Sequence, residues 1–310
     1  MTKFDEYKEL AKQGVYTHSA TFHADDVLTA CMLHISGIIP NYEVIKRVPK
    51  WTPEMGGLAF DVGCGELDHH GKDFNVVRLS NGAKYASLGL LWHQIGVQVM
   101  RDLAIKVSLI FTEELLRIYP IEVPMLNLLK RDPELGLRGA EIAAELFDQD
   151  FITAMDLTDN FGQSKYPNTL SYLISACNPV GMTDEVRDKA FLKCCKDMHP
   201  FVMNAIMSAF RNGLSKRFAL KLAENEKGNV DRIVNESDIH IAAYFLKDTK
   251  VEAVIEPNIR TTGCWNVTCV DGHKIADNVE VGKNGCTFIH ATRFMAVFDN
   301  KDAALNCAIN

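Results

Sequence analysis

Imidazole and carboxylate side chains gather early in this chain, in a pattern suited to binding metal ions. Within residues 18–70, four of the chain's ten histidines lie close to an aspartate in sequence. The first group, in T-H-S-A-T-F-H-A-D-D, consists of His18, His23, Asp25 and Asp26. Mixed imidazole and carboxylate ligands suit manganese, iron, cobalt or zinc, whereas magnesium prefers a site richer in oxygen and water.

Three more groups extend this pattern. Asp61 closes the apolar run A-F-D-V-G. The D-H-H tripeptide supplies Asp68, His69 and His70. In M-D-L-T-D-N, Asp156 and Asp159 stand three residues apart and therefore share one face of a helix, which leaves both as candidate ligands.

The charge of these groups favours metal binding. Packing Asp25, Asp61, Asp68 and Asp159 into one crevice without cations would force several carboxylates to protonate or repel one another. Two divalent ions would remove the conflict, and manganese is the first expectation. Each group alone has an ordinary alternative, because D-H-H is usually a polar loop and H-A-D-D could be a helix N-cap. We expect the histidines outside these clusters to be structural, namely His34, His93, His199, His240 and His273.

The clustered residues fall where short runs rich in β-branched residues end. Candidate strands cover residues 15–18, 42–48 and 58–62, and helical spacing predicts a helix over 26–36. In open α/β sheets, ligands bind outside the carboxyl ends of the strands, so these side chains should converge on one crevice. We therefore expect an α/β fold with a parallel sheet and covering helices.

The rest of the chain predicts a helical middle and a second, smaller lobe. Helical patterns cover residues 84–99, 102–118, 141–159, 168–177 and 184–222, with breaks at Gly162, Pro167, Pro179 and Gly213. Strand patterns cover 251–255, 265–270 and 287–298, and a closing helix covers 302–308. The resulting division has a first domain over residues 1–180, a helical connector over 181–230 and an α+β domain over 231–310.

Composition bounds the function. The chain has 310 residues, of which 47% are hydrophobic and 24% charged, as in an ordinary globular protein. A net charge of −7 disfavours coating of nucleic acid by bulk electrostatics but leaves room for a local basic groove. Arg211, Lys216, Arg217 and Lys221 form a basic stretch, for which a solvated helix face is the favoured interpretation. Nine cysteines without framework spacing, and no apolar run of about 18 residues, predict a cytoplasmic protein without a membrane partner.

Across these motifs the chain resembles the melanocyte proliferating gene family of metal-dependent hydrolases, within the DHH phosphoesterase superfamily. The resemblance continues through R-L-S-N-G-A-K-Y-A-S-L-G-L, F-I-T-A-M-D-L-T-D-N, T-L-S-Y-L-I-S-A-C-N-P, W-N-V-T-C-V and G-C-T-F-I-H-A-T-R-F. It implies a DHH-type catalytic domain that holds two divalent ions, followed by a DHH-associated substrate-binding domain.

The resemblance also implies a role for each site residue. His18 and His23 would bind one metal, Asp61 would bridge, and Asp25 would face the second metal, which His69 and Asp159 complete. In catalysis, His70 would face the scissile phosphate beside Asp61, and Asp68 would orient an imidazole. Substrate contacts would come from Lys84, His290 and Arg293. Asp26 stands where relatives usually carry Glu, and A-T-R-F-M-A-V-F lacks the small residues typical of the family, so Arg293 would alter the substrate pocket.

The expected function is phosphodiester hydrolysis. The resemblance implies an exonuclease-like enzyme acting on RNA or a short oligonucleotide, with water activated between two metals. One alternative is a small-nucleotide phosphatase or pyrophosphatase. Another is a non-catalytic nucleic-acid-binding regulatory module. The sequence leaves the oligomeric state open, with a homodimer as one alternative.

Overall fold

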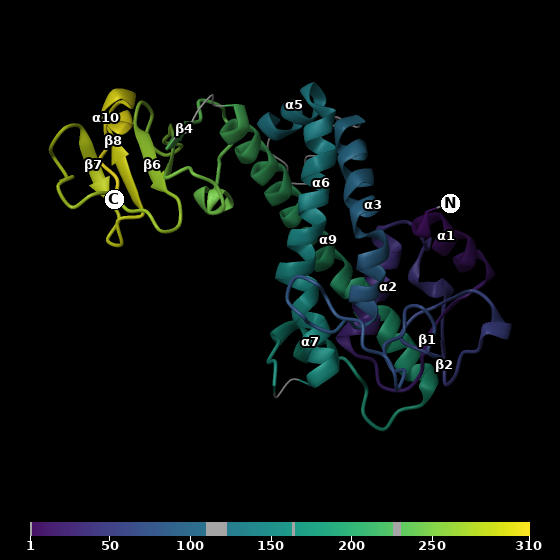
Figure 1. Ribbon diagram of the computed structural model, residues 1–310. Coiled ribbons are helices and arrows are strands. Elements are labelled where there is room, and N and C mark those ends of the chain that lie inside the picture. Colours follow the sequence, from purple (N-terminus) through teal and green to yellow (C-terminus); the bar gives the residue numbers. More distant parts are fainter. Residues whose placement is uncertain (1, 110–122, 163–164, 226–230) are drawn as a thin grey trace. The chain divides into compact units, whose positions relative to one another are not determined.

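The computed structural model describes residues 2–109, 123–162, 165–225 and 231–310 (Figure 1). The chain divides into two compact units. The first consists of Met1–Lys106 with Ala143–Phe210, and the second of Val107–Ile142 with Arg211–Asn310. Each unit has its own sheet, which confirms the α/β class with a smaller C-terminal sheet domain.

The sheet of the first unit is parallel and has the order β2-β1-β3. After helix α1 (Lys3–Gln13), strand β1 (Val15–His18) leads through α2 (Ala24–Ile35) to β2 (Ile45–Val48) (Figure 1). Strand β3 (Leu58–Ala59) pairs on the other side of β1. The expected βαβ unit is therefore present. The second strand is shorter than expected, because its first residues form a 3₁₀ turn.

Helix α2 lies at the centre of the first unit. The carboxylate of Asp26 accepts a hydrogen bond from the backbone N–H of His23 (2.9 Å), which caps the start of the helix. Every side chain from Ala24 to Leu33 is buried. The helix contacts both α7 (Thr153–Phe161) and α8 (Thr169–Ser175). The first turn of α2 is therefore buried among neighbouring helices.

Two helices run through breaks that we expected. Helix α3 (Ser87–Leu109) is continuous across residues 100–101, where no proline or glycine interrupts it; residues 110–118 of the expected second helix lie outside the described part. Helix α9 (Asp184–Asn225) also runs through Gly213. A helical glycine costs only about 1 kcal/mol, and burial of Phe210 and Leu214 beside it offsets that cost.

The remaining helical region is more divided than expected. Helices α5 (Val123–Arg131) and α6 (Pro133–Phe147) precede a π-helical turn (Asp148–Ile152) that leads directly into α7. The expected helix over 141–159 is therefore the end of α6, this turn and most of α7. None of the described helices is both long and apolar enough to span a bilayer.

The sheet of the second unit has the order β4-β5-β6-β8-β7. Its strands are β4 (Arg232–Val234), β5 (Ala253–Pro257), β6 (Trp265–Cys269), β7 (Cys286–Ile289) and β8 (Met295–Phe298). Only β4 and β5 pair in parallel. The three-residue β4 was not predicted, because so short a run carries little alternation.

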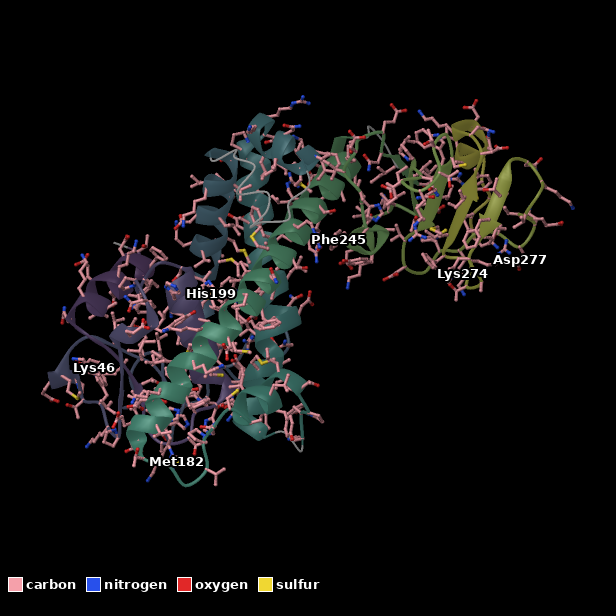
Figure 2. All side chains as sticks on the ribbon, turned by 180° about the vertical axis from the view of Figure 1, so that it is seen from behind. Lys46, Met182, His199, Phe245, Lys274 and Asp277 are labelled. Atoms are coloured by element: carbon pink, nitrogen blue, oxygen red, sulfur yellow. The ribbon has the colours of Figure 1, made fainter. Side chains whose placement is uncertain are left out.

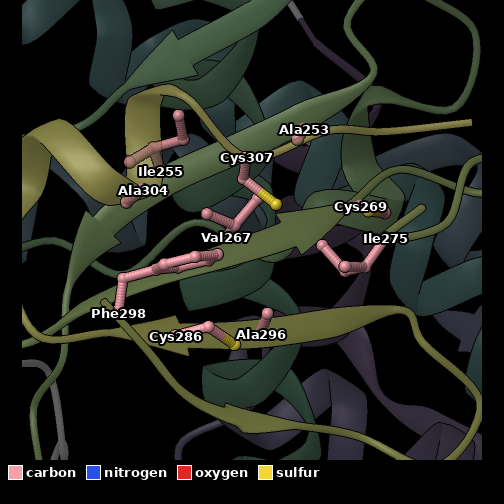
Figure 3. Close-up of a cluster of buried hydrophobic side chains, with 10 residues drawn as sticks. All are labelled: Ala253, Ile255, Val267, Cys269, Ile275, Cys286, Ala296, Phe298, Ala304 and Cys307. Atoms are coloured by element: carbon pink, nitrogen blue, oxygen red, sulfur yellow. The ribbon is translucent and has the colours of Figure 1, made fainter. Parts of the chain in front are cut away.

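The expected strand over 287–298 is a hairpin of β7 and β8. The chain turns between them, and Arg293 in the turn has a φ of 60°, in the left-handed region. Helix α10 (Lys301–Leu305) closes the chain. Ten buried side chains, including Val267, Phe298 and Ala304, form the core between sheet and helix (Figure 3).

Candidate metal centre

The expected ligands converge at the carboxyl edge of the parallel sheet. His18 is the last residue of β1, and Asp61 follows shortly after β3. Asp61 has a φ of 55°, which is uncommon for a residue other than glycine. Such strained conformations persist where the surroundings fix them, and they concentrate at functional sites.

The first ligand group joins His18, His23 and Asp61, whose ligand atoms lie within 4.8 Å of one another. Nε2 of His18 lies 3.3 Å from Oδ2 of Asp61. The other ring nitrogen, Nδ1, donates to the carbonyl of Ser19 (2.8 Å). This bond fixes the orientation of the ring and directs Nε2 toward the carboxylates, as the second hydrogen bond of a metal-binding histidine does.

The second ligand group joins Asp25, His69 and Asp159, again with ligand atoms within 4.8 Å. Nε2 of His69 lies 3.1 Å from Oδ2 of Asp159 and 4.0 Å from Oδ2 of Asp25. It is also 3.4 Å from Oδ1 of Asp61. Asp61 therefore stands beside a histidine of each group, one oxygen toward each.

Asp25 is held by the start of helix α3. Its two carboxylate oxygens accept hydrogen bonds from the backbone N–H groups of Ser87 (2.9 Å) and Leu88 (2.7 Å). A helix N-terminus favours negative charge. Burial nevertheless raises the pKa of Asp25 well above its usual value, and the nearby carboxylates of Asp61 and Asp159 add to the effect.

The carboxylates of the cluster favour the protonated, positively charged form of His18 and His69. Burial lowers the pKa of His18, but Asp26 and Asp61 outweigh it and raise that pKa to about 11. Asp159 and Asp61 likewise outweigh burial and raise the pKa of His69 to about 11. Both Nε2 atoms are buried without a well-oriented hydrogen-bond partner among the described residues. Unsatisfied imidazole nitrogens facing anionic oxygens fit divalent cations.

Asp26 lies deeper in the site than its sequence position indicated. Its Oδ2 atom lies 2.9 Å from Nε2 of His18. The carboxylate is fully buried, which raises its pKa, although His18 opposes that shift. Asp26 thus contributes negative charge to the first ligand group while its other oxygen caps α2.

His70 is partly exposed to solvent, but its Nδ1 atom lies 3.3 Å from Oδ1 of Asp61, in a third possible ligand group of Asp61, His69 and His70. The same Nδ1 atom donates to Oδ1 of Asp68 (2.7 Å), and this bond raises the pKa of His70 although burial opposes the rise. Asp68 also accepts from the backbone N–H of Cys64 (2.6 Å). The His70 side chain is 57% exposed and lines a pocket of about 300 Å³ together with His23 and Asp159. It can therefore present a proton to a bound anion.

Replacing His70 with alanine tests this placement. We expect kcat to fall by about 10²- to 10⁴-fold, because a positioned acid contributes about that much. Bound metal should remain near the parent level, since His18 and His69 keep their carboxylate neighbours. Elemental analysis and steady-state kinetics on the same preparation measure both effects. Loss of metal in His70→Ala but not in His69→Ala would reverse the roles within the pair.

Asp156, the alternative ligand, is engaged elsewhere. Its Oδ2 atom lies 2.6 Å from Nη2 of Arg78, and its Oδ1 accepts from the backbone N–H of Gly89 (3.2 Å). A side chain at Gly89 would overlap this carboxylate. Asp159 instead faces His69, which supports the preference for Asp159.

Sequence reasoning missed two residues that organise the site. Arg78 is 2% exposed and binds the carboxylates of both Asp148 and Asp156. Asn178 accepts from the backbone N–H of Phe22 (2.9 Å) and donates to its carbonyl (2.7 Å), which fixes the loop before α2. Both lie in motifs quoted above, R-L-S-N-G and S-A-C-N-P. Their presence in these motifs was the one indication in the sequence, and it did not show which residues they contact.

Comparison with known proteins identifies the family. The model MYG1_exonuc, described as "Uncharacterised protein family (UPF0160)", matches residues 14–275. The chain belongs to this family. This confirms the resemblance to the melanocyte proliferating gene family.

Two curated yeast proteins are similar to the chain. MYG1 protein YER156C of Saccharomyces cerevisiae is 23% identical over 358 residues, covering 97% of this chain and 95% of that protein. MYG1 protein C694.04c of Schizosaccharomyces pombe is 22% identical over 196 residues, covering 58% and 52%. No solved structure matches.

The family match covers both ligand groups but ends before the β7–β8 hairpin. His290 in that hairpin accepts at Nδ1 from the backbone N–H of Thr292 (3.3 Å), so Nε2 carries the proton. It lines a groove of about 740 Å³ on the second unit's sheet.

Lys84, in the first unit, is half-buried. Its backbone carbonyl accepts a hydrogen bond from Arg78. Lys84 is absent from the described lining of the pocket beside His70. The positions of His290 and Lys84 do not show whether either side chain contacts a substrate.

The guanidinium of Arg293 is occupied by backbone. It donates to the carbonyls of Ile275 (2.7 Å), Ala276 and Val279 (3.1 Å). Asp277, which is exposed in the same loop (Figure 2), has its carboxylate 3.5 Å from Nε of Arg293. These contacts favour a structural role for Arg293 over the expected contact with phosphate.

We accordingly expect Arg293→Ala to destabilise the second unit by about 1–3 kcal/mol, because several carbonyls lose a charged donor. KM should stay near the parent value. Thermal unfolding and steady-state kinetics measure the two effects. Lys283→Ala is the control, since the Lys283 side chain forms an exposed ion pair with Glu280. An unchanged melting temperature with a raised KM would restore the substrate-binding role.

Proposed function

We propose that this protein is a metal-dependent phosphodiesterase that removes nucleotides from the ends of RNA or short oligonucleotides. The observation that carries the proposal is Asp61, which lies between two groups of histidine and aspartate. Two adjacent cation sites with a shared carboxylate suit in-line displacement at phosphorus. The family name, MYG1_exonuc, supports a nuclease-like function.

The chain offers one set of ligands for each ion. His18, His23 and Asp61 would hold the first, and Asp25, His69 and Asp159 the second. Manganese suits this mixture of imidazole and carboxylate. Two bound divalent cations would lower the pKa of a coordinated water toward about 7 and offset the charge on the phosphate.

The side chains around the pocket would complete the chemistry. Asp68 favours the protonated form of His70, whose ring would stabilise charge that develops on the phosphate. Ser171 and Ser175 of α8 line the same pocket and supply hydroxyl groups for polar contacts. The superfamily assignment to DHH phosphoesterases belongs to this proposal, because it rests on the same residues.

A small-nucleotide phosphatase or pyrophosphatase is the second candidate. The pocket beside His70 has a volume of only about 300 Å³, which suits a compact ligand. A non-catalytic nucleic-acid-binding module is the third, and it would bind oligonucleotides without cleaving them.

Metal analysis followed by a substrate panel tests the proposal. We expect about two divalent ions per chain, loss of activity in chelator and recovery with manganese. Single-stranded RNA, single-stranded DNA, duplex and mononucleotides, each assayed with manganese, separate the candidates. A stable metal-free protein that gains nothing from manganese would contradict the dinuclear site. Hydrolysis confined to mononucleotides or pyrophosphate would replace the exonuclease with the second candidate.

A further inference from the structure

Two aromatic rings and a lysine gather where helix α7 ends, beside the pocket. Phe161, the last residue of α7, is 39% exposed. Its ring centroid lies 5.5 Å from that of Tyr166. The ammonium of Lys165 lies 4.6 Å from the Phe161 centroid and 5.5 Å from the Tyr166 centroid. We call these three residues the α7 platform.

The α7 platform is fixed to the helix that carries Asp159. Thr158 donates from its hydroxyl to the carbonyl of Tyr166 (3.0 Å). The backbone N–H groups of Lys165 and Tyr166 both lie 3.2 Å from the carbonyl of Gly162. Thr158, Asp159 and Gly162 also line the pocket. The platform therefore keeps its position relative to the proposed metal ligand.

The composition of the platform suits a nucleotide. Exposed aromatic faces stack on nucleobases of any sequence, and an adjacent ammonium attracts a backbone phosphate. The ammonium now rests on the ring faces, but an exposed cation–π contact is weaker than stacking of a base. The long lysine side chain can swing aside, which frees the rings and leaves the positive charge at their edge.

We propose that the α7 platform binds a neighbouring nucleotide of a single-stranded substrate whose end lies at the metal centre. This inference rests on the proposed function and specifies its substrate class. Phe161 and Tyr166 stack on the unpaired base, and Lys165 contacts its phosphate. Bases in a duplex are already stacked and paired, so the platform favours single strands and gives no advantage to a mononucleotide.

Equilibrium binding tests the platform independently of turnover. The probe is a fluorescein-labelled phosphorothioate single strand, followed by anisotropy with the full chain. We expect Phe161→Leu and Tyr166→Leu each to raise Kd about tenfold, because leucine keeps apolar volume but removes the stacking face. Phe161→Tyr should retain parental affinity. Lys165→Gln should reduce the slope of log affinity against log salt by about 0.7.

Controls separate stacking from general damage. Phe201→Leu replaces another exposed phenylalanine, which lies on α9 and outside the pocket lining, and should leave Kd unchanged. Bound metal, measured by elemental analysis, should be unaffected by the platform variants, because none of the three residues belongs to a ligand group. Thermal unfolding checks that each variant is folded.

The outcomes distinguish this inference from the proposed function. Single-strand binding that weakens in the leucine variants supports the platform even if the parent cleaves nothing. Cleavage by the parent with unchanged Kd in both leucine variants overturns the platform and leaves the proposed function standing. A parent that binds no single strand, or binds duplex equally well, also overturns the platform.

Discussion

Asp61→Asn should reduce turnover by at least about 10³-fold and lower the content of bound metal. Asp61 places one oxygen 3.3 Å from Nε2 of His18 and the other 3.4 Å from Nε2 of His69. The substitution removes the negative charge shared by both ligand groups while it preserves the shape of the side chain. Asparagine also tolerates the left-handed backbone at this position, so the loss reports on charge more than on folding.

Asp26→Asn is the matched control for Asp61→Asn. Its buried carboxylate lies beside His18 of the first ligand group and caps α2, so we expect a smaller loss of activity and retention of metal at the second ligand group. Elemental analysis and kinetics on purified variants, with circular dichroism to check folding, measure the difference. Equal losses in the two variants would contradict the shared position of Asp61.

Arg78→Met should destabilise the first unit by about 3–5 kcal/mol. Arg78 is 2% exposed, and its Nε and Nη2 atoms both lie 2.8 Å from the Asp148 carboxylate while Nη2 also binds Asp156. Its guanidinium lies 4.2 Å from the ring centroid of Tyr85. Removing one partner of a buried ion pair leaves the other charge uncompensated, which is the costly case. Denaturant unfolding measures the change.

Two further variants test the cause of that loss. Arg138→Ala removes an exposed pair with Glu134 and should change stability by less than about 1 kcal/mol. Adding Asp156→Asn to Arg78→Met should recover part of the lost stability, because burial already raises the pKa of Asp156 to about 7 against the opposing effect of Arg78. A double variant as unstable as the sum of both single changes would exclude this coupling.

The cluster of histidines and aspartates could be located from the sequence because the parallel sheet constrains it. His18 and Asp61 follow strands that run in the same direction, and the carboxyl ends of parallel strands meet at one edge. Helical spacing placed Asp156 and Asp159 on one face and could not choose between them. The choice between them depends on Arg78, which is distant in sequence and carries no local signal of its partner.

Some elements differ from those predicted because tertiary packing outweighs the local sequence pattern. Helix α9 passes Gly213 because buried neighbours stabilise it on both sides. The expected single strand over 287–298 turns at Arg293, a residue type that rarely adopts positive φ. The guanidinium of Arg293 binds three carbonyls of another loop, and these long-range bonds fix the turn. Periodicity within the segment could not indicate them.

The division of the first unit into Met1–Lys106 and Ala143–Phe210 sets an order for its assembly on the ribosome. His18, Asp25 and Asp61 are synthesised early, yet Asp159 and the Asn178 clamp on Phe22 come from the later segment. At roughly 5–20 residues per second, the early carboxylates wait several seconds for these partners. A nascent chain released before Asp159 would lack part of the second ligand group and the clamp. Metal capture should therefore be a late event in biosynthesis, coupled to completion of the discontinuous unit.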